Sequence, residues 1–397
     1  MWRRRADVEM LHRAKVRTNP MDKPRRTSRV VPALLVQLAA LGFVTTGTSG
    51  CQSVSTWSWD PDAATLPAAA QPRTGLRAQF FGATTVLIRD DKTALMVDGF
   101  FSRPGLTQLG RVEPNPRRIE KALGFVDASQ VTYLLVAHSH HDHAMDAPMV
   151  AHAKHATLVG SESTHNVALG SECHVHFHLA DTKERLEAGE FRIALFKTKH
   201  SPYRFDDASR RGGIADAIRA WLDDKLAGTI DRPLTTPTPF TDYKVGPSYT
   251  FFIEHPQGKI LIVPSANVPL DLGNIKADVV FLSIADADKL SNERIRAYWR
   301  QAVEKTDAKL VIPVHWDRFW RSLDSPLQPL PSVVDNVGCA MDTFVFLNGD
   351  VRPIKLMPLF EVVDLRAATV GTLSSARQLN SASVADPFTE GCRKGRE

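Results

Sequence analysis

The stretch AHSHHDHAMD, residues 137–146, places four histidines and one aspartate within six consecutive positions. Imidazole and carboxylate groups are the natural ligands of Zn²⁺ and similar divalent cations. His138 and His140 are two residues apart and can point the same way, while Asp142 and His143 follow on a turn. A solvated histidine-rich loop is the alternative interpretation of the cluster alone. Because crowded polar groups cost free energy when they lack a partner, the spacing favours a metal site.

Two more histidines stand where strands are expected to end. VTYLLVAH (131–138) is typical of a buried strand, and FRIALFKTKH (191–200) alternates like a strand that ends on His200. KLVIPVHWD (309–317) is a further strand that delivers His315. Strands and helices recur in two similar halves of the chain. This pattern predicts an α/β fold, a four-layer αββα sandwich with its site along the sheet edges.

The ligand pattern resembles the metallo-β-lactamase-fold hydrolase superfamily over roughly residues 76–360. The residues that carry the resemblance are H-x-H-x-D-H, as His138, His140, Asp142 and His143, followed by His200 and by His315 within PVHWD. HSHHDHAMD and PVHWD look most like the branch with phospholipase D-type enzymes acting on N-acyl ethanolamine phospholipids and with sugar-phosphate lactonases. The resemblance implies one metal on His138, His140 and His200. It implies a second metal on Asp142, His143 and His315, with a bridging hydroxide as nucleophile.

The residues themselves support the same division. Each set supplies three protein ligands and leaves a coordination position open for water, which is typical of a catalytic site. Asp142 is also the expected catalytic residue, because a carboxylate there can orient the nucleophile and move a proton. Asp98 and Asp146 are candidates to support the ligands from behind. For both, an ordinary turn or capping aspartate is the alternative.

One position departs from the superfamily pattern. Relatives place a metal-bridging aspartate after the strand that here reads KILIVPSAN, where this chain has Ser265, Ala266 and Asn267. Asn267 is a possible substitute ligand through its neutral oxygen. With Asp142 as the one protein carboxylate among the six ligands, we expect one tightly held ion at the three-histidine site and a weaker second ion. Zn²⁺ is the expected metal, and Mn²⁺ or Fe²⁺ remain alternatives.

Residues 203–246 form a long insertion that we expect to act as a lid, because long loops in compact domains commonly bind ligands. Its core, IADAIRAWLDDKL, has helical spacing. Tyr203 and three arginines, Arg204, Arg210 and Arg211, are candidates for binding a phosphate or carboxylate, with solvated surface charge as the alternative. His141, in the variable position of the histidine motif, is expected to face solvent.

The N-terminal segment is typical of an export signal. MDKPRRTSRV (21–30) is cationic, VPALLVQLAALGFVTTG (31–47) is apolar, and TSGC (48–51) ends on a cysteine. The pattern resembles a bacterial lipoprotein signal that is acylated at Cys51. An uncleaved anchor or an ordinary secretory signal are the alternatives. Residues 1–50 carry a net charge of +7 against +5 for the whole chain, so the rest, at −2, shows no preference for nucleic acid.

The chain divides into a targeting segment (1–50), a tether rich in Pro, Ala, Ser and Thr (51–75), a hydrolase domain (76–365) and a polar tail (366–397) expected to be disordered. Besides Cys51 there are three cysteines, none in C-x-x-C spacing, so at most one disulfide can form within the mature chain.

These features predict an exported, membrane-anchored lipoprotein on the periplasmic side of a bacterial membrane, with a metal-dependent hydrolase domain. We expect a metal-bound hydroxide to attack a phosphodiester or ester of a lipid-like or small-molecule substrate, because a lipid anchor would hold the site beside a lipid. A lactone or β-lactam hydrolase is the nearest alternative, since attack on a strained carbonyl needs the same metals. A non-catalytic metal- or ligand-binding lipoprotein is an alternative of another class.

Overall fold

The computed structural model describes residues 65, 66, 68, 74–369 and 384–394, which belong to one compact unit spanning Cys51 to Glu397. The expected signal segment and the lipidation residue Cys51 lie outside the described residues and stay predictions. None of the helices in the described part of the chain has the length and apolar character needed to cross a membrane.

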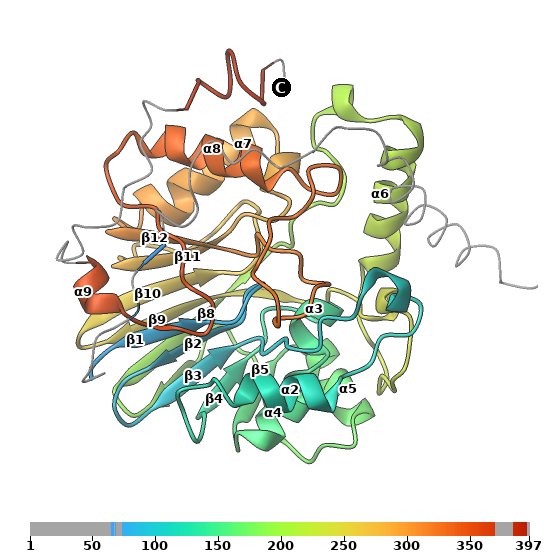
Figure 1. Ribbon diagram of the computed structural model, residues 1–397, viewed down its shortest axis with the longest axis vertical. Coiled ribbons are helices and arrows are strands. Elements are labelled where there is room, and N and C mark those ends of the chain that lie inside the picture. The colour runs from blue at the N-terminus through green and yellow to red at the C-terminus, as the bar shows by residue number, and fades with distance from the viewer. Residues whose placement is uncertain (1–64, 67, 69–73, 370–383, 395–397) are drawn as a thin grey trace, which may run out of the picture. The chain divides into compact units, whose positions relative to one another are not determined.

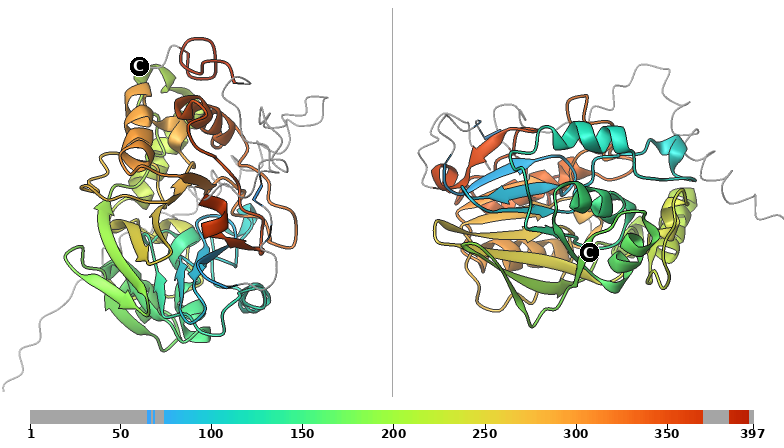
Figure 2. Two further views of the ribbon diagram at one scale, coloured as in Figure 1. Left: turned by 90° about the vertical axis from the view of Figure 1, so that its left-hand side faces the viewer. Right: turned by 90° about the horizontal axis from the view of Figure 1, so that it is seen from below.

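Two β-sheets form the centre of this unit, and both are visible in Figures 1 and 2. The first has the strand order β13-β1-β2-β3-β4-β5-β6 and the second the order β12-β11-β10-β9-β8-β7. The strands of the first are β1 (Arg77–Phe80), β2 (Val86–Arg89), β3 (Ala94–Val97), β4 (Tyr133–Leu135), β5 (Thr157–Gly160), β6 (His176–Leu179) and β13 (Val362–Asp364). Those of the second are β7 (Arg185–Ala188), β8 (Phe191–Thr198), β9 (Ser248–His255), β10 (Gly258–Val263), β11 (Val279–Ser283) and β12 (Leu310–Val314).

Helices cover the outer face of each sheet, with α2, α4 and α5 on one side and α7 and α8 on the other (Figure 1). The α-helices are α2 (Pro116–Leu123), α3 (His141–Ala144), α4 (Ala147–Ala153), α5 (Glu162–Gly170), α6 (Gly213–Leu226), α7 (Asn292–Trp299), α8 (Val337–Asn348) and α9 (Leu365–Thr369). Short helical turns are η1 (Leu106–Gln108), η2 (Ala208–Arg210), η3 (Phe240–Asp242), η4 (Ala287–Lys289) and η5 (Arg300–Glu304). The αββα prediction is confirmed.

Alternation along the strands divides the apolar core into two layers. On β2, Val86 and Ile88 belong to the cluster between the sheets, whereas Leu87 belongs to the cluster under α2, α4 and α5. Successive residues 86–88 of β2 are all apolar because both faces of the first sheet are covered. The second sheet packs its outer face on α7 and α8, where Trp299 stacks on Phe344.

The strand ends that carry the histidine motif, His200 and His315 lie at one edge of the two sheets. A second polar cluster, around His255, lies at the opposite ends of the strands. There the His255 ring lies between Asp90 and Glu190, with its Nε2 atom 3.4 and 3.3 Å from their carboxylate oxygens. Its Nδ1 atom accepts a hydrogen bond from the Gln257 amide at 3.2 Å, so the neutral ring carries its proton on Nε2. With the proton there, Nε2 faces two carboxylates as a donor. The cluster therefore links the two sheets, and its ligand atoms form a candidate metal group separate from the histidine motif.

The expectation of a disordered tail from residue 366 is wrong for the described part of that segment. Residues 365–369 form α9, and residues 384–394 are held to the domain by the disulfide between Cys339 and Cys392. Arg393 is fully buried and donates hydrogen bonds to the carbonyl of Leu290 and to Asn292. Polar composition does not show these contacts, nor the packing of Val384 and Phe388 against the core, which also hold the segment.

Candidate metal centre

Three strand ends bring the expected ligands to one edge of the sandwich. β4 leads into the segment His138–His143. The last three residues of this segment, 141–143, begin α3. β8 ends two residues before His200, and β12 ends directly before His315. His315 has a backbone φ of 58°, in the left-handed region, and its N–H donates to the Ala83 carbonyl at 2.7 Å. Such strained backbone is stored at sites where the surroundings fix it.

The first triad consists of His138, His140 and His200, whose candidate ligand atoms all lie within 4.8 Å of one another. His138 Nε2 and His140 Nδ1 are 3.1 Å apart. Burial, with the neighbouring imidazoles, holds the pKa of His138 and of His140 well below the ordinary value, and burial lowers the pKa of His200 to about 4. These rings are therefore neutral at pH 7 and offer the free lone pairs that a cation needs.

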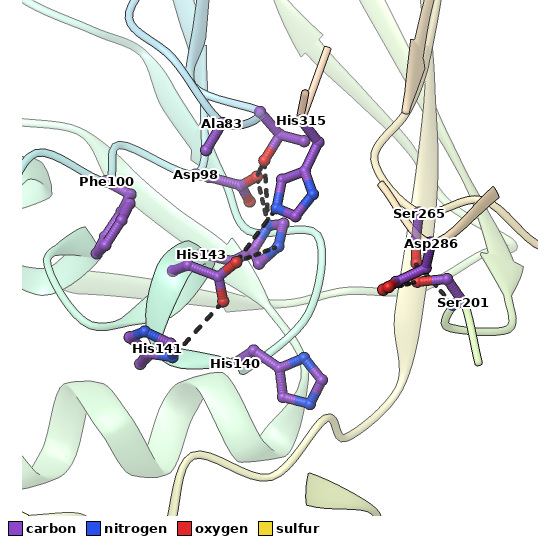
Figure 3. Close-up of polar contacts among 12 residues, drawn as sticks. Ala83, Asp98, Phe100, His140, His141, His143, Ser201, Ser265, Asp286 and His315 are labelled. Carbon is purple, nitrogen blue, oxygen red and sulfur yellow. Dashed lines mark hydrogen bonds and ion pairs between the residues drawn. The ribbon is translucent and has the colours of Figure 1, made fainter. Parts of the chain in front are cut away.

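The second triad consists of Asp142, His143 and His315, again with ligand atoms within 4.8 Å (Figure 3). Asp142 Oδ2 is 3.2 Å from His315 Nε2 and 3.6 Å from His143 Nε2. Burial alone would raise the pKa of Asp142, but the imidazoles of His143 and His315 hold it well below the ordinary value. The carboxylate is therefore ionised and faces two nitrogens across a gap suited to an ion.

Asp98, at the end of β3, lies directly behind the second triad. Its Oδ2 atom is 2.8 Å from His143 Nδ1 and also accepts a hydrogen bond from the Thr84 hydroxyl. Its Oδ1 atom accepts the Ala137 amide at 2.9 Å. A carboxylate on Nδ1 fixes the His143 ring with Nε2 turned toward the site. Asp98 is thus placed to orient a ligand, and it also ties β3 to the end of β4.

His141 is buried inside an aromatic wall, so the expectation that it faces solvent is wrong. The wall consists of Phe100, Phe240, Tyr243 and Phe319, whose ring centroids lie 5.7–6.5 Å from that of His141. Burial lowers the pKa of His141. The sequence could not show this, because the wall is assembled from three distant segments of the chain, around residues 100, 240–243 and 319.

The insertion 203–246 contains α6, as its spacing predicts, but its arginines bind other parts of the protein. Arg204 forms a two-point ion pair with Asp216 at 3.0 and 2.7 Å. Arg210 lies over the Phe205 ring, and Arg211 donates to the Phe205 carbonyl at 2.8 Å. These contacts favour a structural role over anion binding. Tyr203 differs, since its hydroxyl is 3.4 Å from His140 Nδ1.

Comparison with known proteins agrees with this geometry. The model of the metallo-beta-lactamase superfamily matches residues 78–238, a range that contains the first triad and the histidine motif. The segment 78–238 belongs to the metallo-β-lactamase superfamily.

Individual relatives are distant. The UPF0173 protein PF0020 of Pyrococcus furiosus is 25% identical over 126 residues, which are 30% of this chain. The match spans little more than half, 57%, of that protein. Among solved structures, the chain is similar to Igni18, a metallo hydrolase of Ignicoccus hospitalis, and to the metallo-beta-lactamase fold protein YhfI of Bacillus subtilis. Both are 12% identical with a TM-score of 0.41, and the matches cover 72% and 73% of this chain and 97% and 99% of theirs.

The donor set fits the metal ions that proteins of the metallo-β-lactamase superfamily bind. It contains five imidazoles and one carboxylate, all drawn from the edge of the two sheets. Buried neutral imidazoles whose nitrogens face each other without a protein donor between them are costly unless a cation joins them. His138, His140 and His200 would hold one ion, and the second triad would hold the other.

The place of the superfamily's bridging aspartate is taken by residues that support the fold. Ser265 accepts the Ser201 amide at 2.8 Å, and the Ser201 hydroxyl donates to Asp286 at 3.1 Å (Figure 3). The prediction that Asn267 substitutes as a ligand is wrong. Its amide nitrogen donates to the His200 carbonyl and its oxygen accepts from Arg294, so it holds the His200 segment in place.

Without a bridging carboxylate, we expect the chain to retain one ion per molecule after dialysis against a mild chelator. The second triad should lose its ion because one carboxylate offsets less of the repulsion between two cations. Elemental analysis of the dialysed protein measures this directly. In the variant Ser265→Asp, the second ion should be held at least about tenfold more tightly, since a carboxylate returns to the bridging position. Two equally retained ions in the unchanged protein would contradict the prediction.

Asp146, expected to support the ligands, instead fixes the loop that follows Asp98. Its Oδ2 atom accepts the amides of Phe101 and Ser102 at 2.7 and 2.5 Å. In the described part of the chain, its hydrogen bonds reach no metal ligand, so the expectation of direct support is wrong. Burial raises the pKa of Asp146 to about 6.

This raised pKa predicts a pH-dependent stability. Because the folded-state pKa lies above the unfolded one, near 4, the folded chain keeps a proton that the unfolded chain loses. The contribution is present below pH 4 and is lost as the pH rises to 6, about 3 kcal/mol in all. We therefore expect Asp146→Asn to gain stability relative to the unchanged protein between pH 4 and pH 7, as measured by urea unfolding. If the free energies of unfolding of the two proteins differed by the same amount at pH 4 and at pH 7, the prediction would be wrong.

Proposed function

We propose that this metal-dependent hydrolase of the metallo-β-lactamase superfamily cleaves a phosphodiester or an ester in a substrate with a substantial apolar part. The observation that carries the proposal is the convergence of two three-ligand sets, each short of a full coordination shell, beside an aromatic wall. When bound, the ions, with zinc as the favoured metal, supply a hydroxide nucleophile near neutral pH and polarise the scissile oxygen.

Asp142 has the position needed to guide the nucleophile and take its proton. Its Oδ2 atom faces His315 at 3.2 Å, and its Oδ1 atom lies 3.7 Å from His141 Nδ1. The carboxylate is ionised, so it can accept a proton from the nucleophile, and the His141 ring packs beside it. Asp98 holds His143 in orientation throughout.

The surroundings favour an apolar substrate portion over a strongly charged one. Phe319 stacks on His315 with ring centroids 5.8 Å apart, and Trp320 packs edge-on against Phe319. Both rings are only partly buried, so they can contact a substrate. The nearby Arg204 is already paired with Asp216. Recognition of an anion would therefore depend on the ions themselves, which suits a singly charged phosphodiester or a neutral ester.

We also propose that the protein acts outside the cytoplasm, anchored through an acylated Cys51. The disulfide between Cys339 and Cys392 supports export, because such links persist in oxidising compartments. An anchored site beside a membrane would meet lipid substrates at high local concentration. Mass spectrometry of the N-terminal peptide from membranes tests the anchor, and an unmodified Cys51 would refute it.

Four chromogenic assays on zinc-loaded, detergent-solubilised protein test the reaction. The substrates are bis-p-nitrophenyl phosphate, a p-nitrophenyl acyl ester, a lactone and nitrocefin, each run beside His140→Ala. We expect the first two to be turned over and the variant to be inactive. Preferential turnover of the lactone or nitrocefin would favour the strained-carbonyl alternative. Equal background rates in both proteins would favour a non-catalytic binding lipoprotein.

A further inference from the structure

The first triad has an additional oxygen beside it that the six expected ligands do not include. The Tyr203 hydroxyl lies 3.4 Å from His140 Nδ1, and its ring centroid is 5.5 Å from that of His200. This separation is long for a hydrogen bond from a hydroxyl group. Ligand atoms held at about 2.0–2.1 Å by a tetrahedral zinc ion are about 3.3–3.4 Å apart. The hydroxyl therefore stands at the distance expected between two ligands of one ion.

The same spacing occurs within the triads. His138 Nε2 and His140 Nδ1 are 3.1 Å apart, and Asp142 Oδ2 and His315 Nε2 are 3.2 Å apart. The 3.4 Å between the Tyr203 hydroxyl and His140 Nδ1 is therefore close to the distances between the expected ligand atoms.

The lid-like insertion fixes Tyr203 in this place. The amides of Tyr203 and Arg204 donate to the two carboxylate oxygens of Asp223 on α6, at 3.0 and 3.2 Å. Arg204 in turn forms its two-point ion pair with Asp216, which lies about two turns before Asp223 on the same helix. Two carboxylates of one helix therefore clamp the short loop that follows His200. The clamp fixes the backbone from which the Tyr203 side chain reaches His140.

Charge gives a reason for a further anionic ligand. Asp142 is the one carboxylate in the two triads, and position 265 is occupied by a serine. Asp286 and Asp142 also place negative charge near the Tyr203 oxygen. A divalent ion reverses the sign of the local field, as it does for bound water and thiols.

We propose that the Tyr203 oxygen is a fourth protein ligand of the ion held by His138, His140 and His200, with Asp223 as the residue that positions it. The metal–oxygen bond forms as the phenol O–H bond breaks, and the proton passes to solvent. The inference rests on metal binding at the first triad, as in the proposed function, but it does not depend on the substrate. It explains why the first ion should be the tightly held one. With Tyr203 bound, the open coordination position for water that the proposed function needs is the one at the second triad.

Spectroscopy of the metal-loaded full chain tests the assignment without any substrate. A phenolate bound to Fe³⁺ produces a charge-transfer band in visible light, which imidazole and carboxylate ligands do not. We expect this band in the Fe³⁺-loaded protein and its loss in Tyr203→Phe, which keeps the ring. Tyr243→Phe is the matched control, since this tyrosine of the same insertion lies against His141, and it should keep the band. No band in the unchanged protein, or a band that survives in Tyr203→Phe, overturns the proposal.

Zinc affinity provides a second measurement that does not require iron to bind. In competition with a chromophoric chelator, Tyr203→Phe should bind its first Zn²⁺ at least about tenfold more weakly than the unchanged protein. Asp223→Asn should lie between them, because it loosens the clamp and leaves the hydroxyl. Equal affinity in Tyr203→Phe and the unchanged protein overturns the proposal. Hydrolytic activity enters neither test, so a wrong reaction assignment and a wrong ligand assignment give different results.

Discussion

Replacement of Asp142 by asparagine is expected to lower kcat/KM by about 10³-fold or more. The side chain keeps its shape, so the fold should survive, but the negative charge is lost from the second triad. That charge faces His315 Nε2 at 3.2 Å and His143 Nε2 at 3.6 Å. Its loss removes an anionic ligand and the proton acceptor together, and each of these commonly contributes a factor of 10² or more.

The expectation is checked with the substrate that the four assays select, together with elemental analysis. In metal-loaded protein that has not been dialysed against a chelator, Asp142→Asn should hold the first ion and lack the second, because the first triad is unchanged. Asp181→Asn is the matched control, since Asp181 lies in an exposed turn where it accepts the Lys183 amide. It should change neither rate nor metal content. An Asp142→Asn protein that keeps its rate within threefold would show that the second triad takes no part in the reaction.

The ligand positions were predictable because they follow from local rules. Each of the three ligand segments begins within three residues of the end of a strand, and the strand ends of one sandwich edge meet wherever the topology allows. His200 and His315 are therefore brought beside the histidine motif by β8 and β12, although 57 and 172 residues separate them from His143. Hydrophobic alternation predicted β8, the run KLVIPVHWD predicted β12, and the histidine motif predicted the chemistry.

What the sequence did not show depends on contacts between distant segments. Asn267 was expected to face the ions, yet Arg294 from α7 takes its oxygen. His141 was expected in solvent, yet Phe319 and Phe240 cover it. The tail was expected to be disordered, yet Cys392 is linked to α8. None of these contacts leaves a periodic or compositional trace, because each depends on one side chain meeting another across the fold.

Tyr203 belongs to the same class of contact, with one signal that was available. Tyr203 stands three residues after His200, close to the end of β8. The sequence therefore indicates that Tyr203 lies near the third histidine ligand, although its residue type and neighbouring arginines favour anion binding. The clamp on α6 that turns it toward His140 became visible only when the insertion was placed against the site.

The largest expected loss of stability follows from Asp317→Ala, at the end of PVHWD. Asp317 and Arg103 form an ion pair whose side chains are both fully buried. The other oxygen of Asp317 accepts the Ala83 amide at 2.7 Å, and the carbonyl of Ala83 accepts the His315 amide at 2.7 Å. Removing the carboxylate leaves a buried guanidinium without its counter-ion. Breaking such a pair from one side typically costs about 3–5 kcal/mol.

Urea unfolding of three variants separates the loss of the pair from the loss of a single charge. Asp317→Ala should lose most stability, whereas the double variant Arg103→Met, Asp317→Leu should recover much of it, because no buried charge is then left alone. Asp324→Ala removes an exposed partner of Lys121 and should not shift the urea midpoint measurably. If the double variant were as unstable as Asp317→Ala, the cost would lie in lost packing around Ala83 and not in the uncompensated charge. In that case the loop around Ala83 would be what holds the His315 backbone at its positive φ. The metal content of the double variant would then fall together with its stability.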